Sequence, residues 1–202
     1  MNNDVKQRIL SESMLLMFNH GIKVMTMDEL AKRIGVSKRT IYEHFEDKDT
    51  LLTAVLRESK KQNKKQAEKS LKEKPNVIHV FHQYMTNYEN NYFSKLASVV
   101  DEIKRYHPAV YQKEIVAEFG NKLIELKKIF QLGIDQGVFR KDLNIDIAAS
   151  LFQSTGQWIF KGEIDLREQF SLEKIFETYL LIFIRGCCTE KGLKVMDELT
   201  KK

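Results

Sequence analysis

A short run of side chains in the first quarter of the sequence could recognise duplex DNA. Lys38 and Arg39 carry hydrogen-bond donors suited to guanine O6 and N7, and Thr40 can hydrogen-bond or contact a thymine methyl group. Tyr42 and His44 can donate to phosphate oxygens, which fix the register of a protein on the duplex. Together these residue types are typical of a helix that reads the major groove.

The local charge also favours contact with a polyanion. From Leu30 to Tyr42 the chain carries four basic residues and no acidic one. Lys48 adds a positive charge at the start of a predicted helix, whose N-terminus is itself an anion site. The whole chain of 202 residues has 33 basic against 28 acidic residues, an excess too small to indicate nucleic acid binding by itself.

Two short helices joined by a tight turn would present these side chains. Thr26 and Glu29 form a capping-box pattern, in which the threonine oxygen accepts a bond from the Glu29 amide and the glutamate reaches back. Gly35 ends the first helix after two turns, and Ser37 is the expected N-cap of the second. The pattern predicts a helix-turn-helix over about residues 26–45.

Neighbouring helices must hold this pair in place. Ile41 and Phe45, four residues apart, are expected to anchor the second helix in the domain core. An amphipathic helix over about residues 4–20 precedes the pair and stops at Gly21. Another begins near Asp47 or Lys48 and continues into a basic stretch. A generic three-helix packing with solvated charges is the alternative interpretation.

The rest of the sequence also reads as helices. Charged residues make up 30% of the chain and alternate with apolar ones at helical spacing, while two prolines and nine glycines leave few turns for a β-rich fold. Pro75 is expected in the first turn of a helix. The later helices are predicted over about 76–91, 92–106, 109–136, 144–161 and 172–190. We therefore predict an all-α protein with about nine helices.

The stretch TMDELAKRIGVSKRTIYEHF over residues 26–45, followed by DKDTLL over 47–52, resembles the N-terminal signature of the tetracycline-repressor (TetR) family of transcriptional regulators. The match covers roughly residues 4–56. It implies DNA contacts at Thr26, Ser37, Lys38, Arg39, Thr40, Tyr42, His44 and Lys48. Glu43 departs from the pattern, since relatives often have an aromatic or small residue there. An acid at this position can accept from cytosine N4 or repel phosphate.

A second, looser resemblance to the same family lies near the C-terminus, in QLGIDQGVFRKD over residues 131–142 and IAASL over 147–151. It implies a helical ligand-binding and dimerisation domain over residues 57–202, after a DNA-binding domain over residues 1–56. The resemblance also implies a homodimer on a palindromic operator and a repressor that a small-molecule effector releases. Whether it activates or represses is not fixed by the residues.

A basic stretch follows the predicted DNA-binding domain. From Arg57 to Lys74 the chain has eight basic residues against Glu58, Glu68 and Glu73. A solvated helix face explains such a stretch, and contact with DNA is the other interpretation. A protein that coats DNA without sequence preference through this helix is therefore a second alternative function, and it would show a steep dependence on salt.

Aromatic residues in the C-terminal part could line a pocket for an apolar or aromatic effector. The candidates are Tyr84, Tyr88, Phe93, Phe119 and Trp158. Tyr84 and Tyr88 share a helix face, which makes them the first candidates. Aromatic residues at helical spacing are also typical of a packed core, so core packing remains the alternative for each.

Two late helices present more apolar surface than one neighbour needs. The candidates for a dimer interface are Ile147, Leu151, Phe152, Ile175, Phe176, Tyr179 and Phe183. Two such helices from each subunit would form a four-helix interface. Burial of the same residues inside one subunit is the competing interpretation.

The remaining reactive residues do not form a catalytic arrangement. Cys187 and Cys188 are adjacent, so they are expected to act as small apolar residues, with a redox sensor as the alternative. His79 and His82 could share a metal but have no companion ligand at useful spacing, so exposed histidines are expected.

We therefore expect no metal, no cofactor and no enzymatic activity. The alternative is an all-α ligand-binding protein or enzyme with an incidental helix-turn-helix. The N-terminal residues resemble no signal peptide and the longest apolar run is too short for a bilayer, which favours a cytoplasmic protein without membrane contact.

Overall fold

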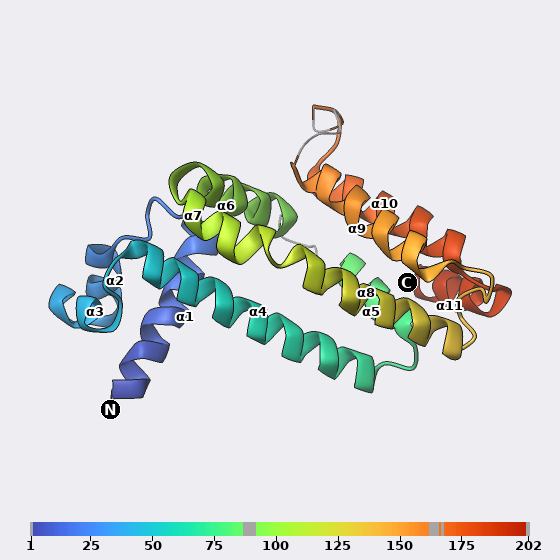
Figure 1. Ribbon diagram of the computed structural model, residues 1–202, viewed down its shortest axis with the longest axis horizontal. Coiled ribbons are helices and arrows are strands. Elements are labelled where there is room, and N and C mark those ends of the chain that lie inside the picture. The colour runs from blue at the N-terminus through green and yellow to red at the C-terminus, as the bar shows by residue number, and fades with distance from the viewer. Residues whose placement is uncertain (1, 87–91, 162–165, 167, 201–202) are drawn as a thin grey trace. The chain divides into compact units, whose positions relative to one another are not determined.

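The computed structural model describes residues 2–86, 92–161, 166 and 168–200, and these are predominantly helical (Figure 1). The helices are α1 (Asn2–His20), α2 (Met27–Ile34), α3 (Lys38–His44), α4 (Lys48–Glu73), α5 (Val77–Thr86), α6 (Tyr92–Tyr106), α7 (Pro108–Val110), the π-helical segment η1 (Tyr111–Val116), α8 (Phe119–Asp135), α9 (Ile145–Lys161), α10 (Leu172–Cys187) and α11 (Glu190–Thr200). Within these ranges the β-structure is one isolated bridge, between Phe139 and Cys188. The predicted all-α fold is confirmed.

The chain divides into two compact units. Unit 1 comprises Met1–Lys65 and Lys95–Glu118, and unit 2 comprises Gln66–Ser94 and Phe119–Lys202. The helix-turn-helix therefore shares its unit with α6, α7 and η1, a combination that the sequence pattern does not reveal. The boundary between residues 56 and 57 divides the chain by function and stays a prediction.

The core of unit 1 is built from apolar residues of α1, α2, α3, α4 and α6. Side chains with no exposed surface are Ile9, Leu16, Met25, Leu30, Ile41, Leu51, Leu52, Val55 and Ile103. Ile41 at the centre of α3 and Phe45 just after it are both buried, as their spacing predicts. Burial of this face holds the opposite face of α3 toward solvent.

The core of unit 2 centres on a cluster of phenylalanines, here called the Phe cluster, whose rings lie 5.2–6.4 Å apart between centroids. Its members are Phe81, Phe130, Phe139, Phe152 and Phe183. They come from α5, α8, the segment after α8, α9 and α10. Phe139 lies directly against Gly133, where a Cβ atom would overlap its ring. These rings pack against one another, and Phe152 and Phe183 among them are half-buried.

The predicted continuous helix over 109–136 is wrong. The chain instead forms α7, the π-helical η1, a turn at residues 117–118 and then α8. A π-turn accommodates one extra residue, and apolar periodicity does not detect a single inserted residue. The π-helical segment contains the buried Glu114, whose partners are described below.

Two other predicted helix boundaries are corrected. Pro75 precedes α5 instead of lying in its first turn, and Asn76 caps that helix by accepting from the amides of Ile78 and His79. The last predicted helix ends at Cys187, and a separate helix, α11, follows from Glu190. Residues 87–91, the end of one predicted helix, lie outside the described residues.

Candidate nucleic-acid interface

Helix α2 begins as its sequence predicts, but only half of the capping box forms. Thr26 has an extended backbone and its Oγ1 accepts from the Glu29 amide at 3.1 Å. The Glu29 carboxylate does not reach back, because it accepts from Arg33 Nε at 2.7 Å. That bond from Arg33 holds the pKa of Glu29 below its ordinary value. The Thr26 amide donates instead to the Val24 carbonyl at 2.8 Å.

The turn between α2 and α3 depends on Gly35. Its φ is +69°, in the left-handed region where a side chain is unfavourable. The next amide, that of Val36, donates to the Ala31 carbonyl at 3.0 Å and closes the end of α2. Arg8 of α1 donates to the Ile34 carbonyl at 2.6 Å and satisfies another free acceptor at this end. Local bonds therefore fix the angle at which α3 leaves α2.

Helix α3 starts at a side-chain cap. Ser37 Oγ accepts from the Thr40 amide at 3.1 Å, and its hydroxyl lies 2.9 Å from Thr40 Oγ1. The cap engages both Ser37 and Thr40, two of the predicted DNA contacts. Its bonds are exposed, so DNA can compete for the same hydroxyls. The cap also aims the first turn of α3 at solvent.

The outward face of α3 carries the predicted base and phosphate contacts. The Arg39 side chain is 89% exposed and pairs with Glu43 at 3.2 Å, while Tyr42 is exposed beside them. Lys38 pairs with Asp28 of α2 at 2.9 Å, which raises the pKa of the lysine. Exposed pairs of this kind are weak and exchange readily for phosphate or base edges.

Glu43, the departure from the family pattern, therefore has a partner within its own helix. Its position one turn after Arg39 lets it hold the guanidinium before DNA arrives. His44 is half-buried beside the Phe45 ring at 6.5 Å, so it is less available than Tyr42. The structure thus gathers Thr26 and the α3 residues in one segment, in which Arg39 is almost fully exposed and Tyr42 is exposed.

Lys48 is directed elsewhere. Its Nζ donates to the Ile22 carbonyl at 2.6 Å, and burial lowers the pKa of the amine. In this conformation the lysine holds the loop between α1 and α2, a role that its sequence position does not predict. Its contact with phosphate stays a prediction.

The end of α6 contributes residues that the sequence did not single out. Glu102 accepts from the amides of Ile22 and Lys23, at 2.8 and 3.3 Å. The Nδ1 atom of His107, which follows α6, forms a short hydrogen bond with Asp49 of α4. Contacts between residues 58 to 80 positions apart leave no local pattern, and the one signal in the sequence is the stop glycine at position 21.

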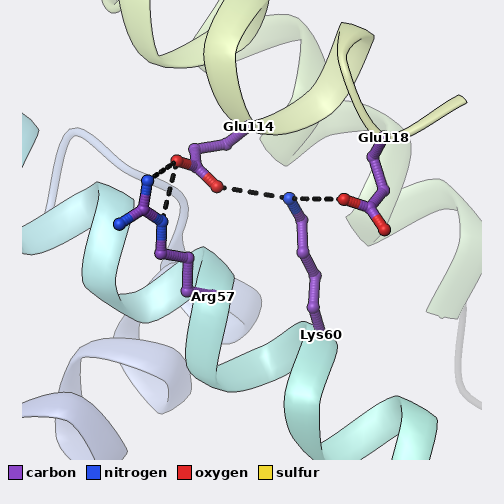
Figure 2. A network of polar contacts seen from close by, with 4 residues as sticks. All are labelled: Arg57, Lys60, Glu114 and Glu118. Carbon is purple, nitrogen blue, oxygen red and sulfur yellow. Dashed lines mark hydrogen bonds and ion pairs between the residues drawn. The ribbon is translucent and has the colours of Figure 1, made fainter. Parts of the chain in front are cut away.

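Two cations of the basic stretch are bound within unit 1 (Figure 2). Arg57 donates from Nε and Nη2 to one oxygen of Glu114, at 2.9 and 2.7 Å, and Lys60 reaches the other oxygen at 3.2 Å. Lys60 also bridges to Glu118 at 3.3 Å. Burial by itself would raise the pKa of Glu114, but bonds from both cations outweigh it and lower the pKa.

The basic stretch is therefore divided between two roles. Its exposed lysines are Lys61, Lys64, Lys65, Lys69, Lys72 and Lys74. Lys69 lies 3.8 Å from Glu73, a loose surface pair. Arg57 and Lys60 hold α4 to η1, so contact with DNA through this stretch would fall to the exposed lysines, and it stays untested.

Of the predicted pocket residues, Trp158 is the one whose side chain lies among the described residues. The side chains of Tyr84, Phe93 and Phe119, and all of Tyr88, lie outside the described residues. Trp158 is exposed on α9. The effector pocket stays a prediction with no described wall.

The predicted dimer residues fall into three groups. Ile147 and Leu151 are exposed on α9, and Ile182 is exposed on α10. Half-buried positions are Phe152, Tyr179 and Phe183, and buried ones are Ile175 and Phe176. The Tyr179 hydroxyl donates to the Phe152 carbonyl, and burial raises its pKa. The exposed group has the most surface open to another molecule, and the predicted dimer interface as a whole stays a prediction.

The other candidate sites have ordinary surroundings. Cys187 and Cys188 are free and buried, and burial raises the pKa of each thiol to about 11. A thiol with a high pKa is a poor nucleophile. His79 Nδ1 lies 3.0 Å from Asn76 Oδ1. Across the described residues no three metal-binding side chains come together, and no helix is long and apolar enough to span a bilayer.

Comparison with known proteins identifies the N-terminal helices. Residues 9–55 match the model of bacterial regulatory proteins of the tetR family. Residues 9–55 therefore form a DNA-binding domain of this family. The chain is a DNA-binding transcriptional regulator.

Full-length relatives agree with this assignment. An uncharacterised helix-turn-helix regulator from Bacillus subtilis, YvaF, is 24% identical over 196 residues, covering 92% of this chain and 96% of its own. A transcriptional regulator from Cytophaga hutchinsonii has a TM-score of 0.71 at 19% identity, covering 90% and 97% of the two chains. A Saccharomonospora viridis protein, solved in complex with choline, has a TM-score of 0.68 at 17% identity, covering 91% and 96%. These two solved structures share the fold of this chain.

Proposed function

We propose that this tetR-family regulator is a homodimeric repressor that binds a palindromic operator and is released by a small molecule. The observation that carries the operator contact is the outward face of α3, on which Arg39 is almost fully exposed. Arg39 contacts guanine and Tyr42 contacts phosphate, while Ser37 and Thr26 orient the helices through their caps.

Dimerisation is supported by the exposed apolar side chains of unit 2. Ile147, Leu151 and Trp158 follow one another along α9, and Ile182 is exposed on α10. Large exposed apolar side chains at helical spacing mark an interaction surface. A second copy of the same surface covers it with twofold symmetry, which sets two α3 helices in successive major grooves about 34–36 Å apart.

An effector binds the helical C-terminal part and shifts the dimer between two conformations. The effector can change DNA affinity by at most the ratio of its own affinities for the two conformations. The related S. viridis fold holds choline, which supports a small-molecule site in this architecture. For this chain we propose an apolar or aromatic effector. The regulator acts on DNA in the cytoplasm and needs no catalytic residue, so an all-α enzyme is not favoured.

Selection of bound sites from random duplex DNA tests the proposal. The wild type is expected to enrich a palindrome, and Arg39→Ala is expected to bind it about 10–150-fold more weakly and to relax the base preference at one position per half-site. Lys141→Ala removes an exposed cation of unit 2 and serves as the control, with unchanged selection. Binding without any enriched sequence would contradict an operator-specific function.

A further inference from the structure

We propose that Glu102 of α6 is a positioning residue for DNA binding, because it holds the loop from which α2 emerges. This inference rests on DNA binding by the chain. It assigns to a carboxylate outside the helix-turn-helix a role in forming the interface. The loop, residues 21–26, connects α1 to Thr26, the N-cap of α2 and a predicted DNA contact.

The peptide groups of the loop are hydrogen-bonded to side chains of two helices, α6 and α4. The Ile22 amide donates to Glu102 Oε2 at 2.8 Å, and the Lys23 amide donates to the same oxygen at 3.3 Å. On the other side of the residue, the Ile22 carbonyl accepts from Lys48 Nζ at 2.6 Å. The Ile22 side chain itself is buried. One residue is thus fixed through its amide, its carbonyl and its side chain.

The loop backbone is shaped to receive this carboxylate. Gly21 has a φ of +82°, and a Cβ atom placed there would lie 2.7 Å from Glu102 Oε1. A side chain at position 21 would therefore both strain the backbone and displace Glu102. The glycine at position 21 therefore leaves the space that the carboxylate of Glu102 occupies.

Two further contacts join the end of α6 to the same region. The Lys23 amine lies over the Tyr106 ring, 4.8 Å from its centroid. His107 pairs with Asp49 in the first turn of α4. Tyr106 is one turn after Glu102, so one end of α6 contacts both the loop before α2 and the start of α4. A displacement of Glu102 would therefore be transmitted to Thr26.

The direction in which DNA affinity changes when Glu102 is removed distinguishes a positioning role from a purely electrostatic one. Glu102 carries a negative charge, and removing it from a protein that binds a polyanion raises affinity when charge alone acts. If Glu102 positions the loop, its removal lowers affinity instead. The salt dependence stays unchanged, since no phosphate contact is lost.

The test compares Glu102→Ala and Glu102→Gln with Asp101→Ala, which removes the neighbouring exposed carboxylate of α6. Binding to the selected operator is measured over a range of salt concentrations. We expect Glu102→Ala to bind about tenfold more weakly with an unchanged salt slope, because it loses bonds to a charged acceptor. Glu102→Gln falls between, and Asp101→Ala binds as tightly as wild type or more tightly. Wild-type or stronger binding by Glu102→Ala would overturn the proposal.

Two further measurements guard against a folding defect and against failure of the operator hypothesis. Circular dichroism checks that the variants remain helical, and amide hydrogen exchange at Ile22 and Lys23 reports the loop directly. Exchange at both amides is expected to accelerate in Glu102→Ala, and unchanged exchange would contradict the proposed grip. If no operator is enriched, the operator hypothesis fails by itself, and a mixed-sequence duplex then replaces it as the affinity probe.

Coupling between positions 21 and 102 gives a second readout. Gly21→Ala alone meets both the clash with Glu102 and the strain of a positive φ. In the Glu102→Ala background only the backbone strain remains, so the same substitution is expected to reduce DNA affinity less. Equal effects in both backgrounds would show that the two positions act independently.

Discussion

The helices α2 and α3 and the helices α9 and α10 expose opposite kinds of side chain. In α2 and α3 the exposed positions are polar and charged, and caps at Thr26 and Ser37 define where the helices begin. In α9 and α10 large apolar side chains such as Leu151 and Ile182 are exposed. Hydrogen bonds between residues close in sequence define where α2 and α3 begin. The exposed apolar side chains of α9 and α10 instead call for a partner that covers them. A polyanion suits one surface and an apolar surface suits the other.

The largest expected effect concerns the Phe cluster beneath α9 and α10. Phe130→Ala removes a fully buried ring that contacts several other rings, so it is expected to lower the free energy of unfolding by about 3–5 kcal/mol. Chemical denaturation measures this change. Phe170→Ala, at an exposed position, is the control and should change stability by less than about 0.5 kcal/mol. Similar losses for both would show that the Phe cluster is not the core of unit 2.

The next effect concerns the exposed apolar surface. Leu151→Glu places a charge at a side chain that is 55% exposed, so it is expected to convert the proposed dimer to monomer while leaving the subunit folded. Light-scattering chromatography measures the mass. Ile124→Glu is a close match, since Ile124 of α8 is 56% exposed but lies outside the proposed interface. Dissociation by both variants, or by neither, would remove the distinction between these surfaces.

A smaller, pH-dependent effect concerns Glu114. Because its pKa is lower in the folded chain than the ordinary 4.5, its ionisation stabilises the fold above about pH 4.5. This contribution is lost as the pH falls through the lowered pKa. Glu114→Gln is expected to lower the free energy of unfolding by about 1 kcal/mol at pH 7. It is also expected to make the loss of stability between pH 7 and pH 3 smaller than in the wild type. Thermal melts from pH 3 to 7 measure both.

Glu118→Gln is the matched control for that experiment. Glu118 accepts only one bond of the network, from Lys60 at 3.3 Å, so its loss should cost less and leave the acid limb in place. If the two variants had equal pH profiles, Glu114 would not be the residue that anchors α4 to η1.

An effect of similar size concerns the cap of α3. Ser37→Ala removes the bond to the Thr40 amide and is expected to cost about 1 kcal/mol of stability, with a loss of operator affinity of similar size. Ser11→Ala, in the middle of α1, is the control and should be close to neutral. An unchanged melting temperature for Ser37→Ala would mean that α3 is positioned by its buried face and not by its cap.

The sequence alone determined the helix-turn-helix, because its signals are local. The threonine and serine caps, the glycine turn and the buried spacing of Ile41 and Phe45 all act within about five residues, and the structure has each of them. The all-α class followed from apolar periodicity in the same way. The predicted DNA contacts follow from residue types on the face that this local geometry leaves open.

The tertiary structure determined which contacts the charged side chains make with residues far away in the sequence. It turned Lys48 toward Ile22, Arg57 and Lys60 toward Glu114, and Glu102 toward the loop before α2. It also interrupted the long helix with a π-helical segment, which periodicity did not reveal. A charged side chain binds whichever opposite charge or free peptide group folding brings within about 3 Å. Its role therefore depends on contacts between residues 26 to 80 positions apart, which no local pattern records.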